Sequence, residues 1–394
     1  MNYILFDQYR DQLLPFTHTR PVSDIRCGIL TMRERWELCL GKQTGTLTEG
    51  YLQPLFPVNS SEESVYVNGA VAGTSQILAG IDELNRGDKL VKGNVVIAAR
   101  PGITARSIAE LEESILSLQP LHFDGDTFVL QHVWDIFAHN DRAIKTDFKL
   151  VTADRRSAPI PGHVTVTGRE QIFIEKGAVI NAGCVINAAT GPVYIGKDAE
   201  IWEGCMIRGP LALCEHGVIK MGAKIYGPTT IGPGCKVGGE VSNVVFFANS
   251  NKGHDGFLGN SVVGEWCNLG ADTNSSNLKN NYDEVKIWDE STGGLVKTGL
   301  TFCGLLMGDH SKCGINTMFN TGTVVGVSCN IFGGGFPEKY IPSFSWGGSD
   351  GLVTYEFDRA METASRMMGR RGKQLSAQEK EMYHYLFREA TKRS

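Results

Sequence analysis

The feature that most constrains this 394-residue chain is a six-residue repeat of aliphatic positions in its second half. Aliphatic residues recur every six positions from Ile195 to Val237 without a slip, and the same period holds from Ile174 to Ile186. The repeat resumes in 257–269 and in 307–325. This period is typical of a parallel β-helix, in which each unit is a short strand plus a turn and three units close one triangular coil. About nineteen units predict roughly six coils and a length of about 30 Å.

Glycine is concentrated in the same part of the chain. Residues 1–171 hold 13 of the 47 glycines, and residues 172–351 hold 32. This shift predicts a domain boundary near residue 170. Some glycines directly follow an aliphatic repeat position, where we expect tight turns that would strain a residue with a Cβ atom. They include Gly196, Gly232, Gly264 and Gly326.

The ten cysteines are too sparse for a disulfide scaffold and include no CxxC pair, which predicts reduced thiols. Five of them lie four residues after an aliphatic repeat position, where small residues recur, so we expect packing roles for these five. They are Cys184, Cys205, Cys235, Cys267 and Cys329.

The overall composition excludes several classes of protein. A formal net charge of -5 and a pI near 6.0 offer no global attraction for nucleic acid or an anionic membrane. No run approaches the roughly 18 apolar residues of a membrane span, and the opening MNYILFDQYR lacks the basic flank of a signal peptide. We therefore expect a cytoplasmic protein.

Two segments interrupt the repeat, and function is expected where a regular coil is interrupted. They lie between Val237 and Phe257 and between Leu269 and Met307, and they are rich in Asn, Lys and Gly. They contain one histidine, His254. Such residues can hold phosphate and carry a proton.

The segment SNKGHDGFLGNSVVGEWCNLGADTNSSNLKNNYDEVK resembles the acetyltransferase region of bifunctional uridyltransferase and glucosamine-1-phosphate acetyltransferase enzymes. The resemblance covers about residues 172–345. It implies a left-handed β-helix, a homotrimer, acetyl-CoA as co-substrate and His254 as the catalytic residue. An amino sugar is mostly ammonium at neutral pH and only its free lone pair attacks a thioester, so a histidine base suits this chemistry.

The same resemblance assigns contacts with the sugar and the acetyl group to Asn268 and Asn277. At one position the chain departs from the family, because Phe257 replaces a tyrosine and one hydroxyl contact is missing. Fixed positive donors are expected for the sugar phosphate or the coenzyme A diphosphate. The candidates are Arg208, Lys252, Lys279 and Lys286.

The first 150 residues have an α/β pattern, with strands expected at 3–6, 65–67 and 95–99 and an amphipathic helix at 103–118. The opening ILFDQYRDQLLPFTHTRPVSDIRCGILTMRERWE is similar to that of sugar nucleotidyltransferases. Residues in register with that family are Leu13, Pro15, Thr17 and Pro21. The glycine loop that approaches a nucleotide diphosphate in the family is replaced by residues 7–10.

Arginines near this opening could substitute as phosphate donors. The candidates for nucleotide binding are Arg10, Arg20, Arg26 and Arg33. The resemblance implies nucleotidyl transfer with Mg²⁺ held by acidic residues, and Asp135 and Asn68 are the metal-site candidates. A degenerate domain with ordinary surface charges stays an alternative.

Helical spacing returns at 356–369 and 376–391, which predicts a helix pair that covers the last coil. Binding of coenzyme A phosphates by Arg370 and Arg371 is the alternative interpretation. The predicted domains are an α/β nucleotidyltransferase-like domain (1–150), a linker (151–171), a β-helix acyltransferase domain (172–351) and C-terminal helices (352–394).

Three classes of function stay open. The first is a bifunctional transferase that acetylates an amino-sugar 1-phosphate such as glucosamine 1-phosphate and transfers UMP from UTP, giving a nucleotide sugar such as UDP-N-acetylglucosamine. The second is a zinc hydratase of the carbonic anhydrase type built from His216, His254 and His310, whose spacings show no local metal-binding pair. The third is an assembly or sensor protein with a non-catalytic N-terminal domain.

Overall fold

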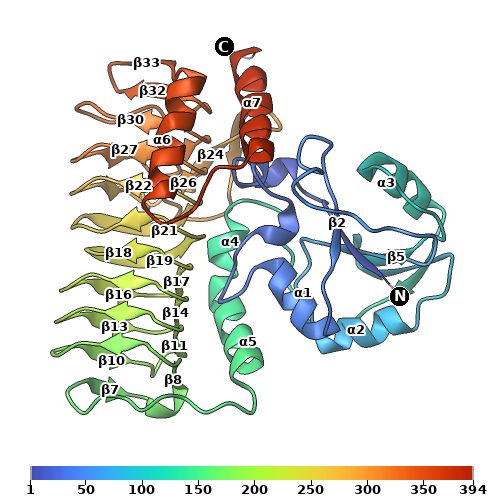
Figure 1. Ribbon diagram of the computed structural model, residues 1–394, viewed down its shortest axis with the longest axis horizontal. Helices are drawn as coiled ribbons and strands as arrows, with labels where there is room; N and C mark the ends of the chain where they lie inside the picture. The colour runs from blue at the N-terminus through green and yellow to red at the C-terminus, as the bar shows by residue number, and fades with distance from the viewer. Residues whose placement is uncertain (1, 393–394) are drawn as a thin grey trace. The chain divides into compact units, whose positions relative to one another are not determined.

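The computed structural model describes residues 2–392, which form two compact units (Figure 1). The first unit comprises residues 2–25, 30–132 and 377–385, and the second comprises 26–29, 133–376 and 386–392. We expected the first domain to end at residue 150. In the structure, helices α4 (Asp135–Ala138) and α5 (Asn140–Thr152), which precede that boundary, group with the second unit.

The first unit is an α/β domain with a mixed sheet in the order β2-β1-β3-β5-β4-β6. The strands are β1 (Tyr3–Phe6), β2 (Gly45–Leu47), β3 (Val65–Asn68), β4 (Asp88–Lys92), β5 (Val95–Arg100) and β6 (Gln119–His122). The helices are α1 (Met32–Leu40), α2 (Ser75–Asp82) and α3 (Ile108–Leu116). Strand β1 is buried at every position: Leu5 packs with α1 and α2, and Ile4 and Phe6 pack with α3. Helices on both faces explain why this central strand is apolar throughout.

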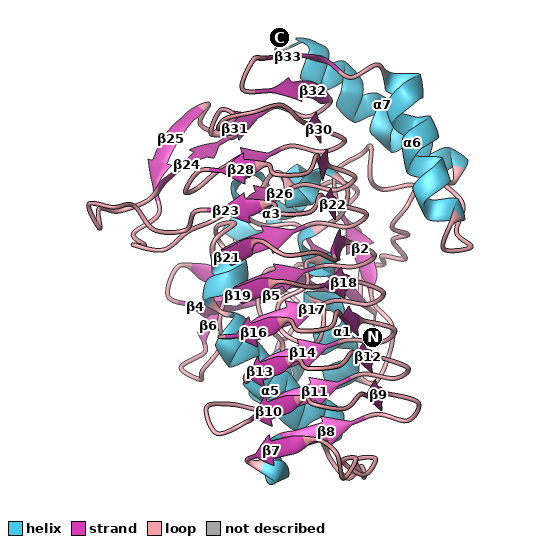
Figure 2. Cartoon of the chain, turned by 90° about the vertical axis from the view of Figure 1, so that its left-hand side faces the viewer, coloured by secondary structure: helices cyan, strands magenta, loops and turns pink. Residues whose placement is uncertain are grey.

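The second unit is a parallel β-helix (Figure 2). One long sheet stacks β7 (Thr165–Thr167), β10 (Val185–Asn187), β13 (Met206–Arg208), β16 (Lys224–Tyr226), β19 (Glu240–Phe246), β21 (Phe257–Val263), β26 (Leu306–Met307), β29 (Val324–Val325) and β31 (Tyr340–Ile341). A second stacks β9 (Val179–Ile180), β12 (Glu200–Ile201), β15 (Val218–Ile219), β18 (Lys236–Val237), β20 (Asn251–Lys252), β22 (Asn268–Leu269), β27 (Lys312–Cys313), β30 (Asn330–Ile331) and β32 (Ser345–Gly348). The third face holds β8 (Ile172–Ile174), β11 (Val193–Ile195), β14 (Leu211–Leu213), β17 (Thr229–Ile231), β23 (Asn274–Ser275) and β28 (Met318–Phe319).

The predicted interior positions are confirmed, but the expected number of coils was too small. Ile201, Ile219 and Val237 are fully buried in one continuous apolar column. Nine parallel strands stack in each long sheet, which corresponds to a length of about 40 Å. The estimate of six coils failed because coils that carry an excursion still stack in register, although their six-residue period is lost.

The cysteines predicted to be packing residues are buried, and three of them alternate with serines along one corner of the β-helix. The Ser250 backbone N–H donates to Cys235 Sγ (3.3 Å), and the Cys267 N–H donates to Ser250 Oγ (2.9 Å). Two coils further, the Cys329 N–H donates to Ser311 Oγ (3.0 Å). Each small polar side chain thus satisfies a backbone donor of the next coil. Burial raises the pKa of Cys235 to about 12, so its thiol stays protonated.

The glycines that follow the repeat positions are required for a different reason from the one expected. Gly196, Gly232 and Gly326 do not have positive φ angles. Instead, the next coil passes directly over them: an added Cβ atom would lie 1.7 Å from Phe247 O at Gly232 and 2.4 Å from Ser343 N at Gly326. These glycines allow neighbouring backbones to approach, rather than allowing a strained turn.

Within the second unit, residues 26–29 and α5 are fastened to the third face of the β-helix. The buried Asn140 side chain donates to Pro228 O (2.8 Å) and accepts from the Gly28 N–H (2.8 Å) and the Thr230 hydroxyl (3.0 Å). Asp147 accepts from the Ile29 N–H (2.9 Å). Helix α5 therefore covers a regular part of the coil, at β17.

The C-terminal segment confirms the predicted helix pair. Strand β33 (Gly351–Thr354) pairs antiparallel with β32, and helices α6 (Phe357–Gly369) and α7 (Ala377–Lys392) follow. Phe344 of the last coil contacts Phe357 and Phe387, with ring centroids 6.4 and 5.2 Å away. Among residues 2–392 no helix is both long and apolar enough to cross a bilayer.

The close approach at Gly232 predicts a large effect of one methyl group. Gly232→Ala should lower the free energy of unfolding by roughly 1–3 kcal/mol, because the backbone of the next coil has to move. Gly314→Ala is the matched control, since Gly314 also follows an interior residue but has no neighbour closer than 3.5 Å to the added Cβ. Urea unfolding of both variants measures the difference, and equal stability of the two would refute the explanation.

Candidate active sites

His254 lies in the turn that joins β20 to β21, where the chain leaves one long sheet and enters the other. Its side chain is exposed, and it makes no side-chain hydrogen bond to the part of the chain that the structure describes. An imidazole in this setting is accessible to a substrate from solution. The exposed position of this side chain is compatible with a catalytic role for His254, which stays a prediction.

Lys252 was expected to bind phosphate, and the structure contradicts this. Its side chain is 1% exposed, and its ammonium donates to the carbonyls of Gly238 (3.1 Å), His254 (2.9 Å) and Asp255 (3.4 Å). The sequence contained a signal for this burial. Lys252 stands two residues after the small position at Ser250, as the interior residue Val237 stands two after Cys235.

Phe257 begins β21, the strand that follows the His254 turn, and Asn277, which follows β23 (Asn274–Ser275), places its side chain beside this strand. The Asn277 amide donates to Asn260 Oδ1 (2.8 Å). A Cβ atom at Gly259 would lie 2.6 Å from both the Asn277 amide nitrogen and the Phe257 ring, so this glycine makes room for them. Asn268 is on the other long sheet, where its Oδ1 accepts from the Asn251 amide (3.4 Å).

The remaining basic candidates are dispersed. Arg208 is exposed on β13, three strands from β21 along the sheet, or about 14 Å. Lys279 forms an ion pair with Asp283 (3.7 Å) and donates to Glu284 O, so it holds its own loop. Lys286 is exposed at the start of β24 (Lys286–Asp289), which pairs with β25 (Gly294–Lys297) in a hairpin. Within one chain, the structure does not gather these cations around His254.

The two other proposed sites in the β-helix are not formed. His216 and His310 precede strands of the second long sheet, four strands apart, and His254 follows a strand of that sheet, so the three lie at different corners and coils. Residues 2–392 contain no cluster of three metal-binding side chains of the His, Cys, Asp or Glu type. Arg371 donates to Gly234 O and to Asn251 Oδ1 (2.9 Å), and thus fastens the C-terminal segment to the coil.

The candidate nucleotide site of the first unit lies at the carboxyl ends of β1 and β2, where open α/β sheets bind ligands. Asp7 follows β1 and is 4% exposed. Its carboxylate accepts from the Val22 N–H (2.8 Å) and the Thr48 hydroxyl, and Arg10 Nη1 is 3.7 Å away. A buried carboxylate thus occupies the place of the family's phosphate-binding loop.

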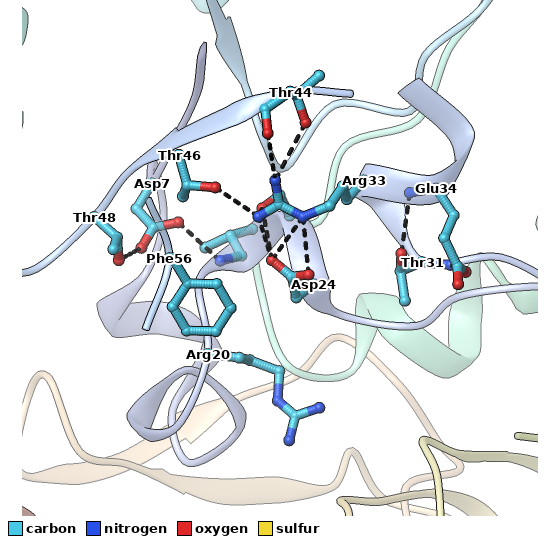
Figure 3. Close-up of polar contacts among 12 residues, drawn as sticks. Asp7, Arg20, Asp24, Thr31, Arg33, Glu34, Thr44, Thr46, Thr48 and Phe56 are labelled. Atoms are coloured by element: carbon cyan, nitrogen blue, oxygen red, sulfur yellow. Dashed lines mark hydrogen bonds and ion pairs between the residues drawn. The ribbon is translucent and has the colours of Figure 1, made fainter. Parts of the chain in front are cut away.

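Two of the predicted nucleotide-binding arginines are bound to acidic side chains or the aromatic ring beside them. Arg33 makes a bidentate contact with Asp24 (2.9 and 2.6 Å) and donates to the Thr44 and Thr46 hydroxyls (Figure 3). Arg10 donates to the Tyr51 hydroxyl and lies over its ring at 5.5 Å. These contacts contradict a role for Arg33 as an open phosphate donor, because its guanidinium is fully used within the domain.

The other two arginines are separated. The Arg20 guanidinium points away from Asp7 and Arg33 (Figure 3). Arg26 belongs to the second unit, where it donates to Ile29 O. Tyr51 and Thr48 could not be identified from the sequence, because no motif marks residues that pack against a loop from about forty positions away.

The predicted metal pair does not fit the structure. Asn68 is fully buried, its amide donates to Gln8 Oε1 (2.6 Å) and Val96 O (2.9 Å), and its Oδ1 accepts from the Ala70 N–H (2.9 Å). Both polar atoms of this buried side chain thus form hydrogen bonds within the domain. Asp135 begins α4 in the second unit, whereas Asn68 belongs to the first.

Comparison with known proteins agrees with this two-part organisation. Residues 3–156 match the family described as sugar nucleotidyl transferase. This part of the chain is therefore similar to sugar nucleotidyl transferases. The uncharacterized acetyltransferase YaiX of Escherichia coli O6:K15:H31 (strain 536 / UPEC) is 28% identical over 171 residues, 43% of this chain and 74% of that protein.

Two relatives are named as bifunctional proteins. The bifunctional protein GlmU of Methanococcus maripaludis (strain C5) is 27% identical over 250 residues, 64% of this chain and 54% of that protein. A bifunctional sugar-1-phosphate nucleotidylyltransferase/acetyltransferase of Sulfurisphaera tokodaii is 29% identical over 146 residues, 36% of each chain. The chain spans about half or less of these bifunctional relatives. It is a transferase of the nucleotidyltransferase and acetyltransferase type.

The buried carboxylate in the transferase domain predicts a pH-dependent stability. Burial raises the pKa of Asp7 from 3.8 to about 6, against the opposing effect of Arg10. The folded state therefore binds this proton more tightly than the unfolded state does. As a result, the contribution of Asp7 to the free energy of unfolding falls as pH rises from about 4 to about 6. Over that pH range, the free energy of unfolding of Asp7→Asn should rise by up to about 3 kcal/mol relative to that of the wild type. Unfolding at pH 4, 5, 6 and 7 measures it, and a pH-independent difference would contradict the assignment.

Proposed function

We propose that the chain is a bifunctional transferase that makes a nucleotide sugar. The β-helix would transfer the acetyl group of acetyl-CoA to the amine of glucosamine 1-phosphate, and the first unit would transfer UMP from UTP to the sugar phosphate. The observation that carries the proposal is the exposed His254 on a β-helix that follows a sugar nucleotidyl transferase domain. As the resemblance implies, the active assembly would be a homotrimer, which the mass in solution would test.

In the proposed acetyl transfer, neutral His254 accepts the proton that the ammonium group has to lose. The amine nitrogen then forms a bond with the thioester carbon and loses a second proton to solvent, and the carbon–sulfur bond breaks to release coenzyme A as a thiolate. The proton held by the imidazole is available for the leaving sulfur. His254 suits this role because its ring faces solvent while a buried cation holds the turn beneath it.

One observation favours a second function in which only the β-helix is catalytic. Asp7 is buried where phosphate-binding backbone is expected, and Arg33 is bound to Asp24. A negative charge in that position repels the phosphates of a nucleoside triphosphate. The alternative is an acetyltransferase whose first unit binds a sugar nucleotide without turnover.

The acetyl-transfer role predicts a specific loss in His254→Ala. Turnover of glucosamine 1-phosphate acetylation should fall roughly 10²- to 10⁴-fold, the usual contribution of positioned proton transfer, with thermal stability unchanged. Wild-type activity should rise with pH, because only a neutral imidazole accepts a proton, and the variant should lose that dependence. His216→Ala, which changes another exposed histidine of the β-helix, is the control. Turnover of His254→Ala within about threefold of wild type would remove His254 from the mechanism.

The nucleotidyl-transfer role predicts that the two activities separate. Arg20→Ala should abolish transfer of the nucleotidyl group and leave acetylation intact, because Arg20 points away from the carboxylate network of its domain. Arg86→Ala, which removes an exposed ion pair with Glu62, serves as the control in the same unit. Products are read by mass after incubation with glucosamine 1-phosphate, acetyl-CoA, nucleoside triphosphates and Mg²⁺. Equal loss of both activities in Arg20→Ala would refute the assignment, and no nucleotide product from the wild type would support the alternative function.

A further inference from the structure

Lys252 occupies an interior position of the β-helix where the neighbouring coils have apolar side chains. It pairs with Val237 on the strand below, and that column continues with Leu269 and Cys313 on the strands above. Val237, Lys252 and Leu269 are each at most 2% exposed. A cation in such a column requires an explanation, because lysine is almost never fully buried without partners.

The lysine ammonium is satisfied by three backbone carbonyls and, among residues 2–392, by no carboxylate within hydrogen-bond distance. Two of the carbonyls, of His254 (2.9 Å) and Asp255 (3.4 Å), belong to the turn between β20 and β21. The third, of Gly238 (3.1 Å), belongs to the corresponding corner of the previous coil. Three donors thus meet three acceptors, and they join the His254 turn to the coil beneath it.

This arrangement costs stability that an apolar residue would not cost. Burial lowers the pKa of Lys252 from 10.5 to about 8, although Asp255, Asp272 and Cys313 oppose the shift. Asp255 is in the same turn, Asp272 follows β22, and Cys313 is on β27. Replacing a buried charge by an apolar side chain of similar volume is often neutral or stabilising. Stability therefore does not explain why a lysine occupies this position, and another role is required.

We propose that Lys252 is a positioning residue for acetyl transfer, whose buried ammonium fixes the His254 turn and hence the direction of the His254 side chain. This inference rests on the proposed role of His254. The lysine touches neither substrate, since it faces the interior, and acts through the backbone of the residue that does the chemistry. Without it, the turn keeps fewer contacts: the Asp272 N–H to Asp255 O (3.1 Å) and the Glu240 N–H to Gly256 O (3.2 Å).

The test compares Lys252→Met with Leu269→Met, which makes the same exchange for methionine at the interior position of the next coil. Lys252→Met should keep or raise the melting temperature. Its Asp272 and Glu240 amides should exchange hydrogen at least tenfold faster than in the wild type. Its kcat for acetylation should fall about 10- to 100-fold with KM for acetyl-CoA within about threefold, since a misplaced base costs turnover more than binding. Leu269→Met should leave exchange and kcat unchanged.

The wild type gives a second measurement that needs no variant to fold. As pH rises through about 8, Lys252 loses a proton and keeps two N–H donors for three carbonyls. Activity should then fall while the melting temperature does not, because the folded state binds this proton less tightly than the unfolded state between about pH 8 and 10.5. This alkaline decline should be absent in Lys252→Met.

Hydrogen exchange separates this inference from the proposed function, because it does not require turnover. Unchanged amide exchange and kcat in Lys252→Met would overturn the positioning role. So would a lower melting temperature with proportional loss of folded protein, since that describes a structural residue. If His254→Ala retained acetylation, the proposed function would fail by itself, and faster exchange in Lys252→Met would still show that the lysine fixes the turn.

Discussion

The β-helix depends on the hydrogen bonds between backbones of successive coils, and these bonds require that the coils stay in register. Because each strand is only two or three residues long over much of the helix, no single strand pairing is strong; the order comes from repetition of the same pairing. Two devices maintain it. Glycines such as Gly232 let the next backbone pass directly over them, and the column that contains Cys235 and Ser250 accepts N–H groups from the coil above.

The same rigid stack of coils also restricts the conformation of an irregular turn. Coils above and below fix the two strands that flank residues 253–256, so the turn has little freedom at its ends. Lys252 then joins the middle of the turn to the coil below through three carbonyls. A buried polar group whose hydrogen bonds are all formed specifies one conformation. Its burial costs free energy, which the apolar side chains of the surrounding column offset. The exposed imidazole of His254 stands on this support.

The transferase domain uses charge differently. Its strand ends form the usual position for a ligand, but Asp7, Arg10, Asp24 and Arg33 neutralise one another there. Arg33 links α1 to residues 22–24 and to β2, so the network stabilises the fold of the domain. These four charged side chains lie where the glycine loop stands in the family that the opening segment resembles, so a nucleotide bound there in the proposed function would need other donors.

The sequence by itself determined the properties that repeat along the chain. The six-residue period placed Ile201, Ile219 and Val237 in the interior, and the position of the small residues marked Cys235 as a packing residue. It also located the interruption that carries His254. Only the tertiary structure decided the partners of long polar side chains. Lys252 faces inward, Arg33 binds Asp24, and the Asn68 amide forms hydrogen bonds within its own domain. The structure also decided that α5 packs with the coil. The physical reason is that periodicity encodes which face of a strand is buried, whereas a lysine or arginine can reach several partners, and the backbone of distant segments decides which one it meets.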